Sequence, residues 1–243
     1  MRFSNISKDM PKVLIIRAKE QGDVTMAQIQ SHKIVTELVP LSDVAYPYER
    51  FKDFDFTSAQ QIIISSSNVL AALSDKQKVQ IQTKIILSVT KALDGFTNII
   101  YFERMSKIVQ YLQQQQNKAK TIYLRGNHTS LTSAEERILA TLNCSHQLCY
   151  NITYHDREFA KIASNLRQGN YDSILFFSKK SSEHFVTLIK LSGLEEHLLN
   201  IKLCCISERV AGVFKAIKAA DILIAKKPNL TELIKCLDYP LAK

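Results

Sequence analysis

The stretch Ile62-Ile63-Ile64-Ser65-Ser66-Ser67 is an apolar run that ends at small hydroxyl residues, and a helical pattern follows it. Three other runs have the same form: Ile85–Leu87 before Ser88, Ile174–Phe177 before Ser178, and Leu203–Ile206 before Ser207. Short β-rich apolar runs that alternate with helical patterns are typical of parallel strands in an α/β sheet. In such sheets the residues just after the strand ends line the ligand crevice. These positions offer hydroxyl and backbone N–H groups, so the sequence predicts a site that binds and shapes a polar ligand.

About ten strands can be predicted, with helices between most of them. They are expected at residues 12–17, 34–40, 61–65, 84–89, 98–102, 121–124, 147–154, 171–177, 202–206 and 221–225. One sheet of that width is possible, but two packed lobes of about five strands each fit a chain of 243 residues better. The fold class is therefore predicted as α/β, with two flavodoxin-like or Rossmann-like lobes whose mostly parallel sheets are flanked by helices.

Two segments look extended and are suited to connect the lobes, one near residues 43–55 and one near 148–155. If the chain crosses twice, the first lobe is discontinuous and consists of residues 11–44 and 155–243. The second lobe, residues 48–150, is then an insertion. Residues 1–9 are polar and are expected to form a disordered extension.

Several helix boundaries can be predicted from capping patterns. A helix is expected at residues 21–31, and another is expected to be capped by Asp156 and to end at Gly169. The sequences Ser133-Ala-Glu-Glu136 and Asn229-Leu-Thr-Glu232 resemble capping boxes at two further helix starts.

The net charge of +9 makes the average surface attractive to anions. The basic residues are scattered, with only short doublets such as Lys179-Lys180 and Lys226-Lys227. A nucleic-acid-binding protein would more often cluster them on one element, with aromatic residues between them. The charge pattern therefore favours a small polyanion over nucleic acid as the partner.

Metal and nucleotide sites are disfavoured. The five cysteines show no C-x-x-C spacing, and the six histidines show no H-E-x-x-H motif. Neither a Walker-type G-x-x-x-x-G-K-[ST] motif nor a G-x-G-x-x-G motif after the first strand is present. We expect no cofactor, with the cysteines acting as small buried apolar residues in a reducing compartment. Because no signal-peptide-length or bilayer-length apolar segment is found, we expect a cytoplasmic protein that does not bind membranes.

A series of segments along the chain resembles uroporphyrinogen-III synthase, a family that opens with a strand of the form V-L-[IV]-T-R-P. The matching segments are Val13-Leu-Ile-Ile-Arg17, Ser65-Ser-Ser-Asn68-Val-Leu70, Leu87-Ser-Val-Thr90-Lys-Ala92, Leu124-Arg-Gly-Asn127, Thr153-Tyr154-His-Asp156, Phe176-Phe-Ser178, Ile206-Ser-Glu-Arg-Val210, and Asp221–Ala225 followed by Pro228–Leu233. Tyr150 is a competing match for the family's tyrosine. The resemblance covers residues 11 to 238 and lies in the order and spacing of the segments.

The resemblance implies a bilobal α/β fold with a cleft between the lobes and an enzyme that needs no cofactor. Its substrate would be hydroxymethylbilane, a linear tetrapyrrole with carboxylate arms. Such enzymes close the chain to a ring, invert the last pyrrole and release water, which is a step of heme biosynthesis. We expect the chain to act as a monomer.

The serines after the strands are the first candidate substrate ligands. We expect Ser65, Ser66, Ser178 and Ser207 to bind carboxylate arms, aided by helix N-terminal amides. The alternative is that each serine only caps its own helix, as serines at such positions commonly do. Both can hold, because a capped helix end still presents further N–H groups. The matching segments add Asn68 and Gly126 as candidate substrate-binding residues.

Tyr154 is the candidate acid that helps to expel the hydroxyl group of the substrate, since a phenol can donate a proton at neutral pH. The alternative is a tyrosine that only packs in the crossing strand. Thr90 takes the place of the family's turn threonine and is the second candidate catalytic residue.

Three arginines lie near strand ends, where a guanidinium could pair with a carboxylate through two hydrogen bonds. They are Arg17, Arg125 and Arg209, and the alternative for each is an ion pair within the protein. A different class of function also stays open at this point: a non-catalytic two-lobed binding protein for an anionic small molecule. The isomer formed from fresh bilane separates the two, because spontaneous closure gives the type I ring.

Overall fold

The computed structural model describes residues 10–30, 34–47, 51–91, 93–116, 118–217 and 221–237. Residues 1–9, where we expect a disordered extension, lie outside this described part. Among the described residues, no helix has both the length and the apolar composition needed to cross a bilayer.

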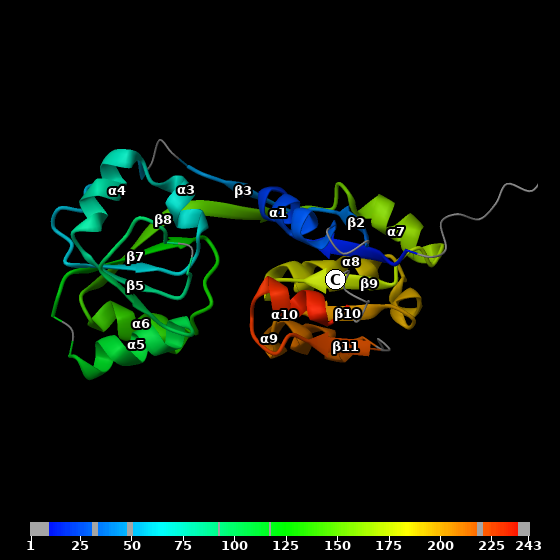
Figure 1. Cartoon of the computed structure of the whole chain (residues 1–243). Helices are drawn as coiled ribbons and strands as arrows, with labels where there is room; N and C mark the ends of the chain where they lie inside the picture. Colours follow the sequence, from blue (N-terminus) through cyan, green and yellow to red (C-terminus); the bar gives the residue numbers. More distant parts are fainter. Residues whose placement is uncertain are drawn as a thin grey trace, which may run out of the picture. The chain divides into compact units, whose positions relative to one another are not determined.

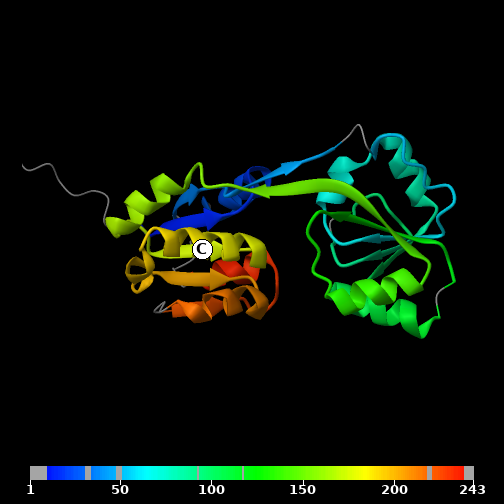
Figure 2. The same ribbon diagram turned by 180° about the vertical axis from the view of Figure 1, so that it is seen from behind.

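The chain divides into two compact units. The first consists of Met1–Asp43 and Thr153–Lys243, and the second is Val44–Ile152. Both boundaries fall inside strands, namely β3 (Ser42–Ala45) and β8 (Cys144–Tyr154), which are neighbours in the sheet of the second unit. The chain therefore passes between the units in extended conformation both times (Figure 1 and Figure 2).

The first unit is built on a five-stranded sheet in the order β11-β10-β9-β1-β2, and all neighbouring strands in it are parallel. The strands are β1 (Lys12–Ile16), β2 (Val35–Leu38), β9 (Ser173–Phe176), β10 (Lys202–Cys205) and β11 (Asp221–Ile224). The central strands β1, β9 and β10 are buried almost throughout, because helices cover both faces of the sheet.

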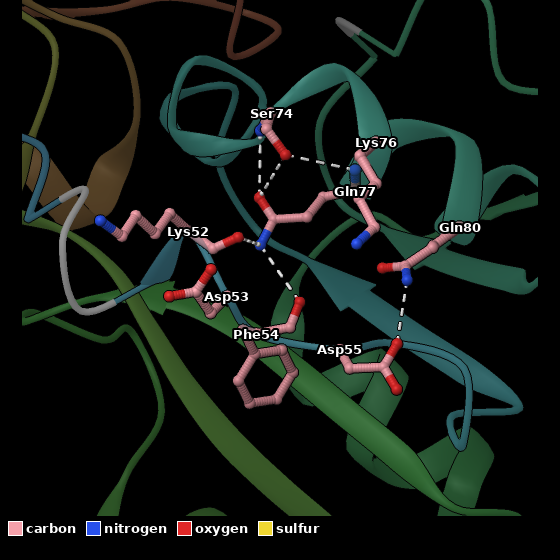
Figure 3. Close-up of a pocket in the computed structure, with 8 residues that line it drawn as sticks. All are labelled: Lys52, Asp53, Phe54, Asp55, Ser74, Lys76, Gln77 and Gln80. Carbon is pink, nitrogen blue, oxygen red and sulfur yellow. Dashed lines mark hydrogen bonds between the residues drawn. The ribbon is translucent and has the colours of Figure 1, made fainter.

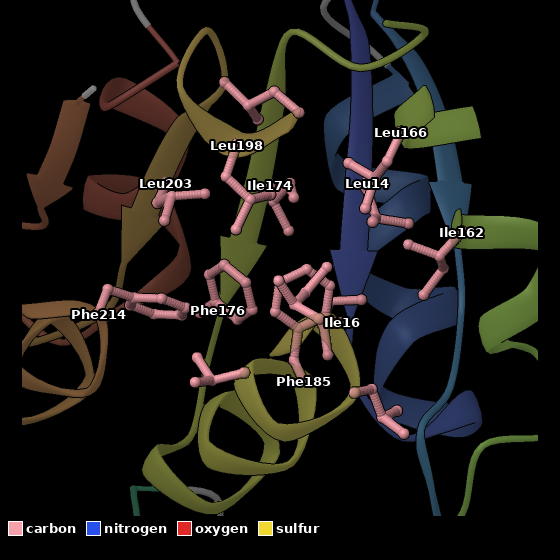
Figure 4. Close-up of a cluster of buried hydrophobic side chains, with 14 of the residues drawn as sticks. Leu14, Ile16, Ile162, Leu166, Ile174, Phe176, Phe185, Leu198, Leu203 and Phe214 are labelled. Atoms are coloured by element: carbon pink, nitrogen blue, oxygen red, sulfur yellow. The ribbon is translucent and has the colours of Figure 1, made fainter. Parts of the chain in front are cut away.

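Alternate residues of each strand of the first unit enter two different cores, as the period of two in a strand requires. One core contains Leu14, Ile174 and Phe176 and is covered by α7 (Phe159–Arg167), α8 (Lys179–Leu191), η1 (Glu195–Leu198), α9 (Glu208–Ala211) and η2 (Gly212–Ala216). Figure 4 shows this core, with Phe176 between Phe185 and Phe214. The opposite core contains Val13, Ile15 and Leu175 and is covered by α1 (Lys19–Gln30) and α10 (Leu230–Lys235).

The second unit has a six-stranded sheet in the order β3-β8-β7-β4-β5-β6. Its remaining strands are β4 (Gln61–Ile64), β5 (Ile85–Ser88), β6 (Ile99–Tyr101) and β7 (Thr121–Gly126), and the five strands from β8 to β6 pair in parallel. Ile62 and Ile64 pack with α3 (Asn68–Ala72) and α4 (Asp75–Gln82) on one face. Ile63 packs with α5 (Met105–Gln114) and α6 (Ser133–Thr141) on the other.

The predicted α/β class, with two mostly parallel sheets flanked by helices, is confirmed by these sheets. All ten predicted strands are present, and β3 is an additional strand that overlaps the start of the segment that we expected to be a connection. The predicted helix at 21–31 begins two residues earlier, at Lys19, and is described to Gln30. One expectation about the serines was wrong: Ser88 is followed by a turn and not by a helix.

Two predicted helix starts lie at other residues. Helix α6 is capped by Thr132, whose partner in the capping box is Glu135, so the predicted box at Ser133 was wrong by one residue. The residue that a Ser133 box would need, Glu136, instead forms an ion pair with Arg125. Asp156 does not cap α7: its carbonyl accepts from the Phe159 N–H at 2.8 Å, which makes a turn before the helix begins. The predicted cap at Asn229 is confirmed by its 2.9 Å bond from the Glu232 N–H.

Candidate functional site

Each sheet has one point at which the strand order reverses, and such a point is where open α/β sheets form their ligand crevice, outside the carboxyl ends of the strands. Numbered within its unit, the first sheet has the flavodoxin-like order 2-1-3-4-5, and its reversal lies between β1 and β9. The second unit's parallel strands follow the Rossmann-like order 3-2-1-4-5, with the reversal between β4 and β7. Each unit therefore has its own candidate binding edge.

Arg17 and Ser178 flank the reversal point of the first unit, because they follow β1 and β9. The Arg17 guanidinium donates to Thr25 Oγ1 at 2.8 Å and to Gln21 Oε1 at 3.3 Å, both on helix α1. It also lies 4.3 Å from the centre of the Phe177 ring. Burial lowers the pKa of Arg17. An arginine stays protonated in proteins, so Arg17 is a cation that Thr25 and Gln21 of α1 hold in place at this edge.

Ser178 is the N-cap of helix α8. Its hydroxyl accepts from the Ser181 N–H at 3.1 Å, and Ser178 Oγ donates to Ser181 Oγ at 2.8 Å. The capping alternative therefore holds for Ser178. The first turn of the helix still leaves the N–H groups of Lys179 and Lys180 without a helical acceptor, as every α-helix does.

Tyr154 lies at the same helix end. This half-buried residue is the last of β8, and its phenol hydrogen-bonds to the hydroxyl groups of Ser181 and Ser178. Burial raises the pKa of the Tyr154 phenol, and these two hydrogen bonds oppose the rise. At neutral pH the phenol is therefore protonated. The structure thus joins two predicted site residues, Tyr154 and Ser178.

Ser207 and Arg209 follow β10, the strand next to β9. Ser207 occupies the N-cap position of α9, but its side chain makes no capping hydrogen bond. Capping therefore does not account for this serine. Arg209 is exposed, and within the described residues it makes no ion pair.

Ser65 and Ser66 lie at the reversal point of the second unit, directly after β4. Ser65 Oγ lies 3.0 Å from the hydroxyl of Tyr123, a residue that is 1% exposed. Ser66 Oγ accepts from the Asn68 N–H at 3.3 Å and also forms a hydrogen bond with the Tyr150 phenol. Asn68 is the first residue of α3, so Ser66 satisfies one N–H group at this helix end, while Ser67 holds the N-cap position without a side-chain bond.

Thr90 lies beside this edge, because β5 pairs with β4 and Ser88 is the register partner of Ile64. The buried Ser88 hydroxyl accepts from the Thr90 N–H at 3.1 Å, and its one hydrogen is shared between the carbonyls of Thr90 and Ile64, both 3.0 Å from Oγ. Ser88 therefore fixes the turn that presents Thr90.

Arg125 and Gly126 end β7 on the other side of β4. Arg125 pairs with Glu136 at 2.9 Å, and its Nε donates to the Gly126 carbonyl at 3.1 Å. The alternative of an ion pair within the protein therefore holds for this arginine. Gly126 lies against the Tyr150 ring: a Cβ at this position would be only 2.4 Å from Tyr150 Cε2.

This close contact makes Gly126→Ala a destabilising substitution. The added methyl group must displace the Tyr150 ring, which is 5% exposed, from the core, and such overpacking costs about 1–3 kcal/mol. Urea unfolding measures the change. Gly212→Ala is the control, because a Cβ there would meet nothing within 4 Å. Equal unfolding free energies for Gly126→Ala and the wild type would contradict the contact.

Three residues of these edges were not among the predicted site residues, although Tyr150 was the competing match for the family's tyrosine. Tyr123 and Tyr150 bond Ser65 and Ser66 from neighbouring strands, and Asn127 clamps β8 by donating to the Ile152 carbonyl at 3.0 Å and accepting from its N–H at 2.8 Å. Asn127 could have been found, because it closes the L-R-G-N segment. The contacts of the two tyrosines with the serines could not be predicted from the local sequence, since only strand pairing brings these side chains together.

A pocket of about 390 Å³ in the second unit lies away from the predicted residues. Figure 3 shows its lining, with Gln77 and Gln80 of α4 facing the loop of residues 52–55. The Gln77 side chain is buried and donates to the carbonyls of Phe51 at 2.8 Å and Phe54 at 3.2 Å, and Gln80 donates to Asp55 at 2.9 Å. These amides serve to fix the loop.

The cysteines are unpaired thiols, four of them buried. Burial raises the pKa of Cys144, Cys149, Cys204 and Cys205 to about 12, so these thiols stay neutral and unreactive. Within the described ranges, no group of three histidine, cysteine or acidic residues is suited to hold a metal ion.

A family model described as Uroporphyrinogen-III synthase HemD matches residues 23–235 of this chain. Among solved structures, a mutant uroporphyrinogen III synthase from the extremely thermophilic bacterium Thermus thermophilus is similar, with a TM-score of 0.63 and 11% identity over 94% of this chain and 97% of that one. Uroporphyrinogen-III synthetase from Helicobacter pylori 26695 is similar with a TM-score of 0.58 and 17% identity over 94% and 98% of the two chains. At these identities the two likenesses concern the fold alone. No curated protein matches the sequence.

Proposed function

The chain belongs to the uroporphyrinogen-III synthase family, and we propose that its two sheet edges bind hydroxymethylbilane and that Tyr154 acts as the acid of the reaction. The family is one of cyclising lyases in tetrapyrrole synthesis. The observation that carries the proposal for the site is the position of the Tyr154 phenol, which is bonded to two serines at the carboxyl edge of the first sheet.

The first unit supplies the charge that a polycarboxylate substrate needs. Arg17 is a fixed cation at the reversal point, and Arg209 follows the neighbouring strand as an exposed cation. The Ser207 hydroxyl, which caps nothing, lies two residues before Arg209. A guanidinium binds a carboxylate through two parallel hydrogen bonds, so Arg209 and Ser207 together suit one carboxylate arm.

The second unit supplies shape and neutral hydrogen-bonding groups. Ser65 and Ser66 are held by buried tyrosines, and Thr90 is held by Ser88. Because partners inside the unit fix these groups, they lose little entropy when a ligand binds, and they can orient a flexible chain. We assign Asn68 and Gly126 to the same edge, as the residues that follow the serines and end β7.

The chemical step begins with proton transfer from the Tyr154 phenol to the hydroxyl oxygen of the substrate's hydroxymethyl group. The carbon–oxygen bond then breaks and water leaves, because hydroxide itself is a poor leaving group. The resulting azafulvene is attacked by the substituted carbon of the last pyrrole, and the spiro intermediate rearranges to the ring with that pyrrole inverted. When the ring closes, the last pyrrole loses the proton of its free α-carbon, and this proton restores the Tyr154 phenol, so that the bilane is converted to the ring product and one water.

Tyr150, the competing match, is less suited to this role. It is 5% exposed, and its ring packs on Gly126 in the core of the second unit. Tyr154 is half-buried and ends its strand at a helix N-terminus, so a substrate can approach it.

Alanine substitutions of two serines separate capping from substrate binding. Ser178→Ala removes the cap of α8 and should lower the free energy of unfolding by about 1 kcal/mol. Ser207→Ala removes no capping bond and should change the free energy of unfolding by less than about 0.5 kcal/mol. The KM for the bilane should rise about 10-fold or more, because one hydrogen bond to a charged group contributes about 1.5–3 kcal/mol. Urea unfolding and initial-rate kinetics measure both effects. An unchanged KM in folded Ser207→Ala would refute the substrate contact.

A further inference from the structure

One face of helix α8 contacts Tyr154 along its length: at the hydroxyl group, at the ring and at the main chain next to it. Ser178, Ser181 and His184 are spaced three residues apart, so successive members are neighbours on the helix surface. The two serines bond the Tyr154 phenol, and the His184 ring lies 5.5 Å from the Tyr154 ring, centre to centre, at 46°. Residues of the same helix on its other side, such as Ser182 and Phe185, are buried in the core.

His184 also holds the main chain next to Tyr154. Its Nε2 lies 2.9 Å from the carbonyl oxygen of His155. Because a carbonyl oxygen can only accept, His184 Nε2 must carry the hydrogen and donate it. The His155 N–H in turn donates to the Leu41 carbonyl at 3.1 Å. The residue after Tyr154 is therefore fixed through both of its peptide groups.

We propose that His184 is a positioning residue of the cyclisation, which sets the ring plane of Tyr154 while Ser178 and Ser181 set its hydroxyl group. This inference rests on the proposed acid role of Tyr154. A tyrosine ring has two rotatable side-chain bonds, and the two serines hydrogen-bond its hydroxyl group. The imidazole restricts the ring itself. Small misplacements of a reacting group cost large factors in rate, so the loss of this contact should act on kcat.

Three substitutions of His184 test the two contacts separately. His184→Ala removes both and should lower kcat about 10-fold, with the KM for the bilane changed less than about 2-fold. His184→Gln keeps an N–H donor for the His155 carbonyl, and His184→Phe keeps a ring against Tyr154. Each should lose less activity than His184→Ala. His197→Ala is the control, since this exposed histidine of the same unit lies on η1. All variants are first compared with the wild type by urea unfolding.

A double-mutant cycle with Tyr154→Phe identifies the path of the effect. If His184 acts through the phenol, His184→Ala lowers type III ring formation in the wild type but adds little when Tyr154 is already phenylalanine. Equal, additive losses in both backgrounds would show a general structural role and overturn the inference while the acid role stands. Wild-type kcat in His184→Ala would overturn it as well. Wild-type kcat in Tyr154→Phe would instead overturn the acid role and this inference together.

Discussion

Tyr154→Phe should lower kcat for type III ring formation by about 100-fold to 10,000-fold, the range in which general acids contribute to catalysis. The change removes only the hydroxyl oxygen, and the ring that faces His184 stays in place. The KM for the bilane should change little, because the predicted carboxylate contacts come from other residues. Stopped assays with oxidation of the product and separation of the isomers give the rate.

The control for this substitution is Tyr171→Phe. Tyr171 is a tyrosine of the same unit whose phenol also has a side-chain partner, Asn165, at 2.9 Å. It precedes β9 and so lies at the opposite end of the sheet from Ser178. Its substitution should reduce stability and leave kcat nearly unchanged. A loss of less than about 3-fold in Tyr154→Phe would instead mean that the protein acts mainly by folding the bilane for closure.

The pH dependence of kcat should also show that the reaction needs the proton of the Tyr154 phenol. Burial raises the pKa of Tyr154 above the ordinary value of 10.0, so the acid form prevails through neutral pH. The midpoint of the alkaline decline in activity should therefore lie above pH 10. In Tyr154→Phe this alkaline decline should be absent from the residual rate.

Phe176→Ala should destabilise the first unit by about 3–5 kcal/mol, the usual cost of removing a buried phenylalanine ring. Phe176 is 0% exposed and is the last residue of β9, the central strand of its sheet. Its ring is 4.5 Å from that of Phe214 and 5.2 Å from that of Phe185, centre to centre. The cavity left behind borders Phe214 of η2 and Phe185 of α8.

Urea unfolding followed by circular dichroism measures this loss. Leu191→Ala is the control, because Leu191 ends α8 in the same unit and is 80% exposed. It should change the free energy of unfolding by less than about 0.5 kcal/mol. A loss below about 1 kcal/mol in Phe176→Ala would contradict the packing of this core.

The strands could be predicted from the sequence because each is a short apolar run bounded by polar residues. Ile62-Ile63-Ile64 is buried on both faces, as a central parallel strand must be, and its apolar residues are therefore continuous. The addition of β3 could not be predicted in the same way. It is a four-residue strand with a polar and an acidic residue, and its place beside β8 depends on pairing over about 100 residues of sequence.

The candidate site could be predicted only in part. The positions of Ser65, Ser66 and Ser178 after their strands follow from the strand ends, but the partner of each hydroxyl does not. Ser178 caps its helix and Ser207 does not, although both precede a helix after a strand. Ion pairs could not be predicted from the sequence either. Arg125 pairs with Glu136 because α6 begins at Ser133, which places the Glu136 carboxylate beside the end of β7.

The isomer formed by the wild-type protein from freshly prepared hydroxymethylbilane tests the central claim most directly. Held at the sheet edges and activated by Tyr154, the bilane should close with its last pyrrole inverted, so that the type III ring dominates the product. A product that consists of the type I ring, at the rate seen without protein, would show that the chain does not direct ring closure.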